Sequence, residues 1–155
     1  KVQGATTLNS LMAKHGHNKA AVASAGGIPP LVEMVRFGTD RCKTQAAIAL
    51  SSLAVNKENR VFIADAGAIL PLVELIKHGS VDSKAQGAAA LKNLAANADN
   101  EEAIVRAGGI KPLLRMLLTD DCEGEGHSSE GARQAAAALF NISHNSVSQK
   151  LIAKE

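Results

Sequence analysis

Three copies of one motif run along the 155-residue chain. They read AGGIPPLVEMV at 25–35, AGAILPLVELI at 66–76 and AGGIKPLLRML at 107–117. The glycines and prolines at matching positions keep a constant step of 41 residues: Gly26, Gly67 and Gly108, and Pro30, Pro71 and Pro112. Self-similarity at a fixed period of this length is typical of solenoid proteins, in which each unit stacks only on its neighbours.

An Ala-rich stretch completes each unit. It reads AAIALSSLAVN at 46–56, GAAALKNLAAN at 87–97 and AAAALFNISHN at 135–145. The last step is 48 residues rather than 41, because the third unit carries seven extra residues in the acidic segment 119–130. We therefore divide the chain, as one array over 1–155, into a partial repeat at 1–18, repeats at 19–59, 60–100 and 101–148, and the start of another at 149–155.

Each unit is predicted to form three helices, at 19–25, 29–37 and 41–55 in the first full repeat. Gly26 and Gly27 are expected to end the first helix with positive φ angles. Pro30 suits the first turn of the second helix, where its missing N–H is not needed. The chain is poor in strand-forming residues and has no sustained alternation of apolar and polar residues. The predicted fold class is all-α, a right-handed solenoid.

These turns, with the helices ALKNLAAN and ALFNISHN, resemble the armadillo repeat family, which includes importin-α, β-catenin, the vacuolar armadillo proteins and the plant U-box ligases. The HEAT repeat is the neighbouring alternative, and the Gly-Gly or Gly-Ala turn followed by Pro favours armadillo. The resemblance implies a protein–protein interaction scaffold whose third helices line a concave groove for an extended peptide segment of a partner. Two alternatives are a nuclear-import adaptor of the importin-α type and a structural spacer in a multidomain protein such as a U-box ligase.

The family's groove carries an Asn on each third helix that holds the main chain of the peptide. The resemblance implies this role at the matching positions, Ser10, Ser52, Asn93 and Asn141. A Gln stands seven residues before each of them, a spacing that puts it on the same helix face: Gln3, Gln45, Gln86 and Gln134. We expect both sets to line the groove, because an amide can donate to one peptide group and accept from another.

The charge of the third helices predicts which peptides the groove prefers. Residues 41–56, 84–97 and 131–145 contain no Asp or Glu. The cations assigned to the groove are Lys43, Lys84, Lys92 and Arg133. We expect an acidic or neutral peptide to be preferred. The chain has no Trp, so the stacked Trp rings of the importin-type groove are missing. Phe140, next to Asn141, is a candidate hot spot.

The sequence predicts no enzyme, cofactor or metal site, since it contains no P-loop, HExxH or nucleophile elbow. A calcium loop starting at Asp121 would need a Glu where Ala132 stands. The net charge of +2, with no basic stripe, argues against nucleic acid, and the apolar runs are too short to span a membrane. Cys42 and Cys122 match no disulfide or zinc framework, which favours an intracellular location, cytoplasmic and/or nuclear. Both ends cut through repeats, so we expect a fragment with possible end-to-end association.

Overall fold

The computed structural model describes residues 17–118 and 130–144, and every regular element in those ranges is a helix. The expected all-α fold is confirmed. The helices are α2 (His17–Ser24), α3 (Ile28–Phe37), α4 (Asp40–Leu53), α5 (Lys57–Asp65), α6 (Ile69–His78), α7 (Val81–Leu94), α8 (Ala98–Arg106), α9 (Ile110–Leu118) and α10 (Glu130–Ile142). Helices expected at 19–25, 29–37 and 41–55 thus begin and end within two residues of the observed ones.

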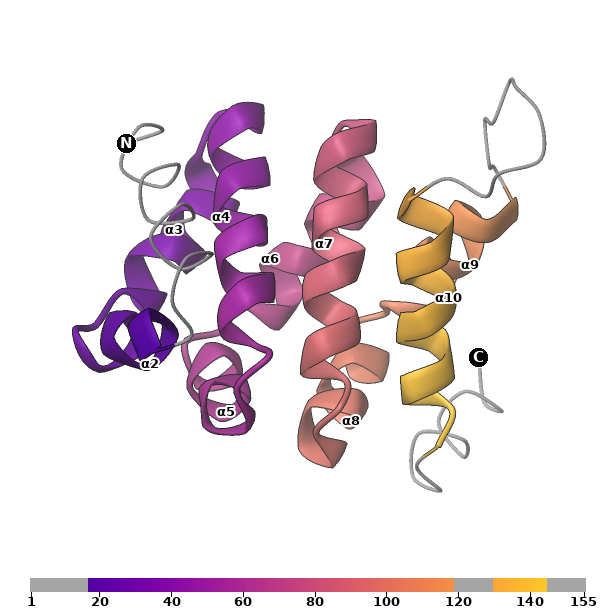
Figure 1. Cartoon of the computed structure of the whole chain (residues 1–155). Coiled ribbons are helices and arrows are strands. Elements are labelled where there is room, and N and C mark those ends of the chain that lie inside the picture. The colour runs from indigo at the N-terminus through magenta and orange to yellow at the C-terminus, as the bar shows by residue number, and fades with distance from the viewer. Residues whose placement is uncertain (1–16, 119–129, 145–155) are drawn as a thin grey trace.

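The helices lie in two layers with a row of short helices at one end (Figure 1). Helices α4, α7 and α10 lie side by side, and each packs on the next along the chain. Helices α3, α6 and α9 lie behind them, while α2, α5 and α8 form the row at the lower end of Figure 1. We call the surface formed by α4, α7 and α10 the third-helix face. Since each helix of this face comes from a different repeat, a binding surface there must be assembled from several repeats.

The repeated glycine has a defined backbone role. Gly26, Gly67 and Gly108 have φ angles of 74°, 74° and 73°, a conformation that L side chains rarely adopt. The same expectation was wrong for Gly27, whose φ is −71°. A Cβ at Gly27 would lie 2.8 Å from the carbonyl oxygen of Val22. The second glycine is therefore required by close approach of the backbone and not by a left-handed turn.

The core consists of aliphatic side chains and alanine. Leu91 and Leu94 of the central helix α7 are fully buried, as are the interhelical alanines Ala46, Ala88 and Ala135. Burying one leucine side chain contributes about 1.5–3 kcal/mol. All three phenylalanines of the chain are exposed instead: Phe37 by 80%, Phe62 by 57% and Phe140 by 64%. The aromatic rings are therefore surface features and are not needed to fill the core.

Asparagines at the end of the first two Ala-rich stretches cap the helices that follow. The Asn56 side chain accepts from the N–H groups of Glu58 and Asn59 and so caps α5, and Asn97 caps α8 in the same way through Asn100 N–H. The buried Asn59 side chain then donates to the Leu53 carbonyl at 3.1 Å, satisfying an acceptor at the end of α4. The capping chemistry recurs with the repeat.

Candidate functional site on the third-helix face

An open hollow of about 770 Å³ lies between α7 and α10 on the third-helix face. Three alanines (Ala96, Ala136 and Ala137) leave room for it, because their side chains are the smallest that a helix favours. The larger side chains around it are Arg60, Lys92, Asn93, Arg133, Phe140 and Asn141. Five of these six were candidates from the sequence, and the fold brings them together from two different repeats.

Asn93 and Asn141 make matching contacts with the preceding third helix. The Asn93 Nδ2 group donates to the Ser51 carbonyl at 2.9 Å and to the Ser51 Oγ at 3.2 Å. The Asn141 Nδ2 group donates to the Lys92 carbonyl at 2.9 Å. The acceptors occupy equivalent positions in successive repeats, so each asparagine joins its helix to the one before. Neither Oδ1 atom has a hydrogen-bond partner within residues 17–118 and 130–144.

Three cations and no carboxylate line the hollow, since Lys92 and Arg133 are joined there by Arg60. Arg133 pairs with Glu130, one turn earlier on α10, and Glu130 also accepts from the Gln134 side chain. This acid precedes the acid-free segment 131–145, so the sequence analysis did not count it with the groove. It partly offsets the charge of Arg133, although both side chains are exposed and such pairs are worth less than about 1 kcal/mol.

Phe140 forms an apolar edge of the hollow. Its ring lies edge-to-face with the His144 ring, with 4.5 Å between the two centroids. His144 Nδ1 lies 2.9 Å from the Phe140 carbonyl oxygen. The histidine therefore packs along one edge of the phenylalanine, and 64% of the Phe140 surface stays open to solvent. An exposed aromatic beside cations and amides is the composition found at protein-binding hot spots.

Other candidate residues lie outside the hollow. Ser52, Gln45, Gln86 and Gln134 are partly buried and none of them lines it. The Oε1 atom of Gln134 is buried without a partner among the described residues. Lys43 lines a different hollow between α3, α4 and α6, and Lys84 lines neither. Gln3, Ser10 and most of the acidic segment 119–130 lie outside the described residues, as do the apolar ends expected to associate.

Arg60 was missed by the sequence analysis. It lies at the start of α5, where its guanidinium donates to the carbonyls of Ala54 at 2.9 Å, Val55 at 3.3 Å and Ala96 at 3.3 Å. These carbonyls belong to the C-terminal ends of α4 and α7, where a cation is favoured. One arginine thus joins two repeats at the lower end of the hollow. The sequence could have indicated Arg60, because it is a cation that follows shortly after the Ala-rich stretch 46–56.

No group of three His, Cys, Asp or Glu side chains among the described residues is arranged to hold a metal ion. None of the helices within 17–118 and 130–144 combines the length and apolar character needed to cross a membrane. Cys42 is buried as a free thiol.

Comparison with known proteins gives one family. The Armadillo/beta-catenin-like repeat model matches residues 17–55 and 56–96. No curated protein matches the chain. The designed armadillo repeat protein YIII(Dq)4CqI is 28% identical, with a TM-score of 0.85 over 98% of this chain and 63% of that one. The designed protein YIII(Dq.V1)4CPAF, in complex with peptide (KR)4, is 23% identical with a TM-score of 0.83 over 98% and 62%.

A natural protein has the same fold. The ARO (armadillo repeats only) protein from Plasmodium falciparum is 23% identical, with a TM-score of 0.81 over 91% of this chain and 60% of that one. The chain spans about three fifths of the length of these structures. The two family-model matches are adjacent, together span more than half of the chain, and include the turns at Gly26 and Gly67 and the cap at Asn56. The chain belongs to the armadillo/β-catenin-like repeat family.

Proposed function

We propose that the chain binds an extended segment of a partner protein along the third-helix face, centred on the hollow between α7 and α10. The observation that carries this proposal is the gathering of Lys92, Asn93, Arg133, Phe140 and Asn141 around one open hollow. The armadillo fold is a protein-binding scaffold and not a typical enzyme fold. A designed relative in complex with a peptide supports a peptide as the ligand class.

The side-chain oxygens of Asn93 and Asn141 would accept hydrogen bonds from the main chain of the partner. Their Nδ2 groups already donate to Ser51 and Lys92. Their Oδ1 atoms are the acceptors left over, and an amide oxygen can accept from a peptide N–H. We therefore expect Asn93 and Asn141 to accept from the partner, while the partner's carbonyls meet other donors.

The charge of the hollow supports an acidic or neutral partner. Lys92, Arg133 and Arg60 line it without a carboxylate, and Glu130 offsets only one of the three. A partner carboxylate in the hollow would gain attraction from cations that are already positioned, whereas a lysine or arginine would be repelled. A transport adaptor for basic peptides is the competing function, and the designed protein bound to (KR)4 proves that this fold can accept such a peptide.

A binding screen of three peptide classes separates these functions. The probes are (KR)4, an Asp-Glu peptide of the same length and a neutral Ser-Ala peptide, each measured by fluorescence anisotropy. We expect the acidic peptide to bind at least tenfold more tightly than (KR)4, a difference of about 1.4 kcal/mol. Preference for (KR)4 would establish the transport-adaptor alternative, and binding of none of the three would favour the structural spacer.

The variants must distinguish lost contacts from lost folding. Asn93→Ala with Asn141→Ala is expected to abolish peptide binding, but it also removes two contacts between helices. Arg133→Glu reverses one charge of the hollow without touching those contacts, and we expect it to weaken the acidic peptide about tenfold. Ser52→Ala is the matched control, because Ser52 stands at the Asn position of α4 and does not line the hollow. Equal effects from Ser52→Ala and Arg133→Glu would contradict the proposed site.

A further inference from the structure

A second hollow lies away from the one between α7 and α10. Its volume is about 410 Å³, and it forms where the last turn of α3 and the first turn of α4 meet the length of α6. Val35, Pro71 and Leu75 are the buried residues of its lining. The volume falls in the lower part of the range of about 300–1,000 Å³ that small ligand sites occupy. It can therefore take one large side chain and its neighbours.

Two apolar side chains stand exposed at the edge of this hollow. Phe37 is 80% exposed and Leu70 is 57% exposed, and both line it. Their positions come from adjacent repeats, so the stacking of α3 on α6 brings them to one place. An apolar group left in water contributes nothing to folding, whereas covering it would stabilise a complex.

The matching positions one repeat further along the chain both carry polar residues. At the 41-residue step, His78 corresponds to Phe37 and Lys111 corresponds to Leu70. The helices α6 and α9 form with these polar residues in place. Stacking of the repeats therefore does not require a large apolar side chain at either position, and Phe37 and Leu70 need another explanation.

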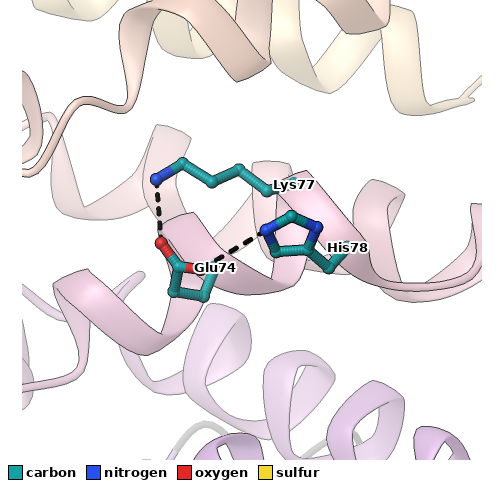
Figure 2. A network of polar contacts seen from close by, with 3 residues as sticks. All are labelled: Glu74, Lys77 and His78. Atoms are coloured by element: carbon teal, nitrogen blue, oxygen red, sulfur yellow. Dashed lines mark hydrogen bonds and ion pairs between the residues drawn. The ribbon is translucent and has the colours of Figure 1, made fainter.

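One of the two acids that line the hollow, Glu74, is already paired with cations. The Glu74 carboxylate accepts from Lys77 Nζ at 2.8 Å and lies 3.6 Å from His78 Nε2 (Figure 2). The hydrogen bond from Lys77 lowers the pKa of Glu74, so the carboxylate stays ionised and paired. On the facing side, the Arg36 guanidinium contacts Glu33 at 3.5 Å and the Gly67 carbonyl at 3.2 Å.

One cation that lines the hollow has no ion-pair partner among the described residues. Lys43 makes no ion pair within the described residues, and it lies in the first turn of α4, where the helix end is itself positive. Asp40 lies in the same turn, where the helix end stabilises its carboxylate. An incoming carboxylate would thus find Lys43 without an ion-pair partner, while an incoming cation would meet Glu74 already paired with Lys77 and Asp40 already stabilised by the positive helix end.

We propose that this hollow is a second docking site for a partner protein, which inserts a leucine- or phenylalanine-sized side chain between Phe37 and Leu70 and places a carboxylate at Lys43. The site is independent of the peptide groove, because the two hollows share no lining residue. Together they would let the scaffold hold two partner segments at once.

A short acidic, apolar peptide tests the site in the full 155-residue chain. The probe is acetyl-Glu-Leu-Leu-Phe-amide, added to ¹⁵N-labelled protein while amide chemical shifts are followed. We expect saturable shifts around α3, α4 and α6. The matched probes acetyl-Lys-Leu-Leu-Phe-amide and acetyl-Glu-Ala-Ala-Ala-amide should bind at least fivefold more weakly, because each lacks one of the two required groups.

The decisive variant places at each of the two positions the residue found 41 positions later. Phe37→His with Leu70→Lys should weaken the probe at least tenfold without changing the midpoint of thermal unfolding, and Lys43→Ala should remove the preference for Glu over Lys. Phe140→Lys, in the other hollow, should leave binding unchanged. The proposal is overturned by absence of saturable shifts, by shifts confined to α7 and α10, or by unchanged binding in the double variant. Self-association of the free chain that Phe37→His removes would identify a second copy as the occupant and also overturn it.

Discussion

Two interfaces between third helices can be compared, α4 with α7 and α7 with α10. They share asparagine contacts and buried alanines but differ in their exposed side chains. In both, an asparagine donates to a carbonyl of the preceding helix, Ser51 in the first and Lys92 in the second. In both, buried alanines let the helices approach. The positions that α10 fills with Arg133 and Phe140 are filled on α7 by Ala85 and Lys92.

This difference separates the residues that hold the repeats together from those that recognise a partner. The asparagines and buried alanines that join the helices recur at both interfaces, so they follow from the repeat itself, whereas the 2.7 Å contact between Thr44 Oγ1 and Ser83 Oγ joins α4 to α7 alone. The aromatic ring and an added cation occur only at the second, beside the 770 Å³ hollow. A repeat scaffold can thus place a specific site at one interface while keeping the asparagine contacts and buried alanines that both interfaces share.

The largest expected effect breaks both interfaces together. Leu94 is fully buried at the end of α7, which packs on both α4 and α10. Leu94→Ala should lower the free energy of unfolding by about 3 kcal/mol, since core truncations of this type cost about 2–5 kcal/mol. Urea denaturation followed by circular dichroism measures it. A loss below 1 kcal/mol would mean that α7 is not the shared centre of the stack.

The next-largest effect is expected from a variant that gives the α7–α10 interface the side chains of the α4–α7 interface. Phe140→Lys with Arg133→Ala places the residues of α7 on α10. We expect peptide affinity to fall about 30-fold, which corresponds to about 2 kcal/mol and to the loss of one hot spot. Stability should hardly change, because both side chains are exposed. Isothermal titration with the acidic peptide measures it, and unchanged affinity would remove Phe140 and Arg133 from the site.

A smaller effect tests whether the asparagine contacts are equivalent. Asn93→Ala and Asn141→Ala should each lower the free energy of unfolding by about 1 kcal/mol, the usual worth of one hydrogen bond. The loss at Asn93 should be the larger, because its Nδ2 group also donates to the Ser51 Oγ. Chemical denaturation of the two variants side by side gives the difference. The opposite order would show that the α7–α10 interface depends more on its asparagine.

The smallest expected change in stability comes from Glu74, which lies outside both interfaces. It shows how little an exposed ion pair contributes. Lys77 lowers the pKa of Glu74 below its ordinary value of 4.5. A lowered pKa in the folded state stabilises the protein above that ordinary value, and the gain is lost as the pH falls through the folded pKa. Glu74→Gln should therefore cost at most about 0.5 kcal/mol at pH 7, because the pair is exposed, and nothing at pH 2. Thermal unfolding at the two pH values measures it, and an equal loss at both would exclude the ion pair as its cause.

Five residues of the candidate site were predicted from their positions in the repeat and from the family resemblance. Asn93, Asn141, Lys92, Arg133 and Phe140 were identified on their helices, and the fold brings them to one hollow. The glutamines seven residues earlier share their helices but not the hollow, because a common helix face does not specify which neighbouring side chains enclose a space. Lys43 was assigned to the same groove, yet it lies beside Phe37 and Glu74.

The sequence by itself determined the helices, their order and their stacking. A 41-residue step in glycine, proline and alanine fixes where each helix ends and which face it buries, and these are local properties of the chain. Only the tertiary structure decided which surface residues meet. Arg60 donates to the carbonyl of Ala54 in the preceding repeat, and Phe37 and Leu70, from adjacent repeats, line one hollow. Such contacts depend on the angle and distance between stacked units, and no single repeat contains that information.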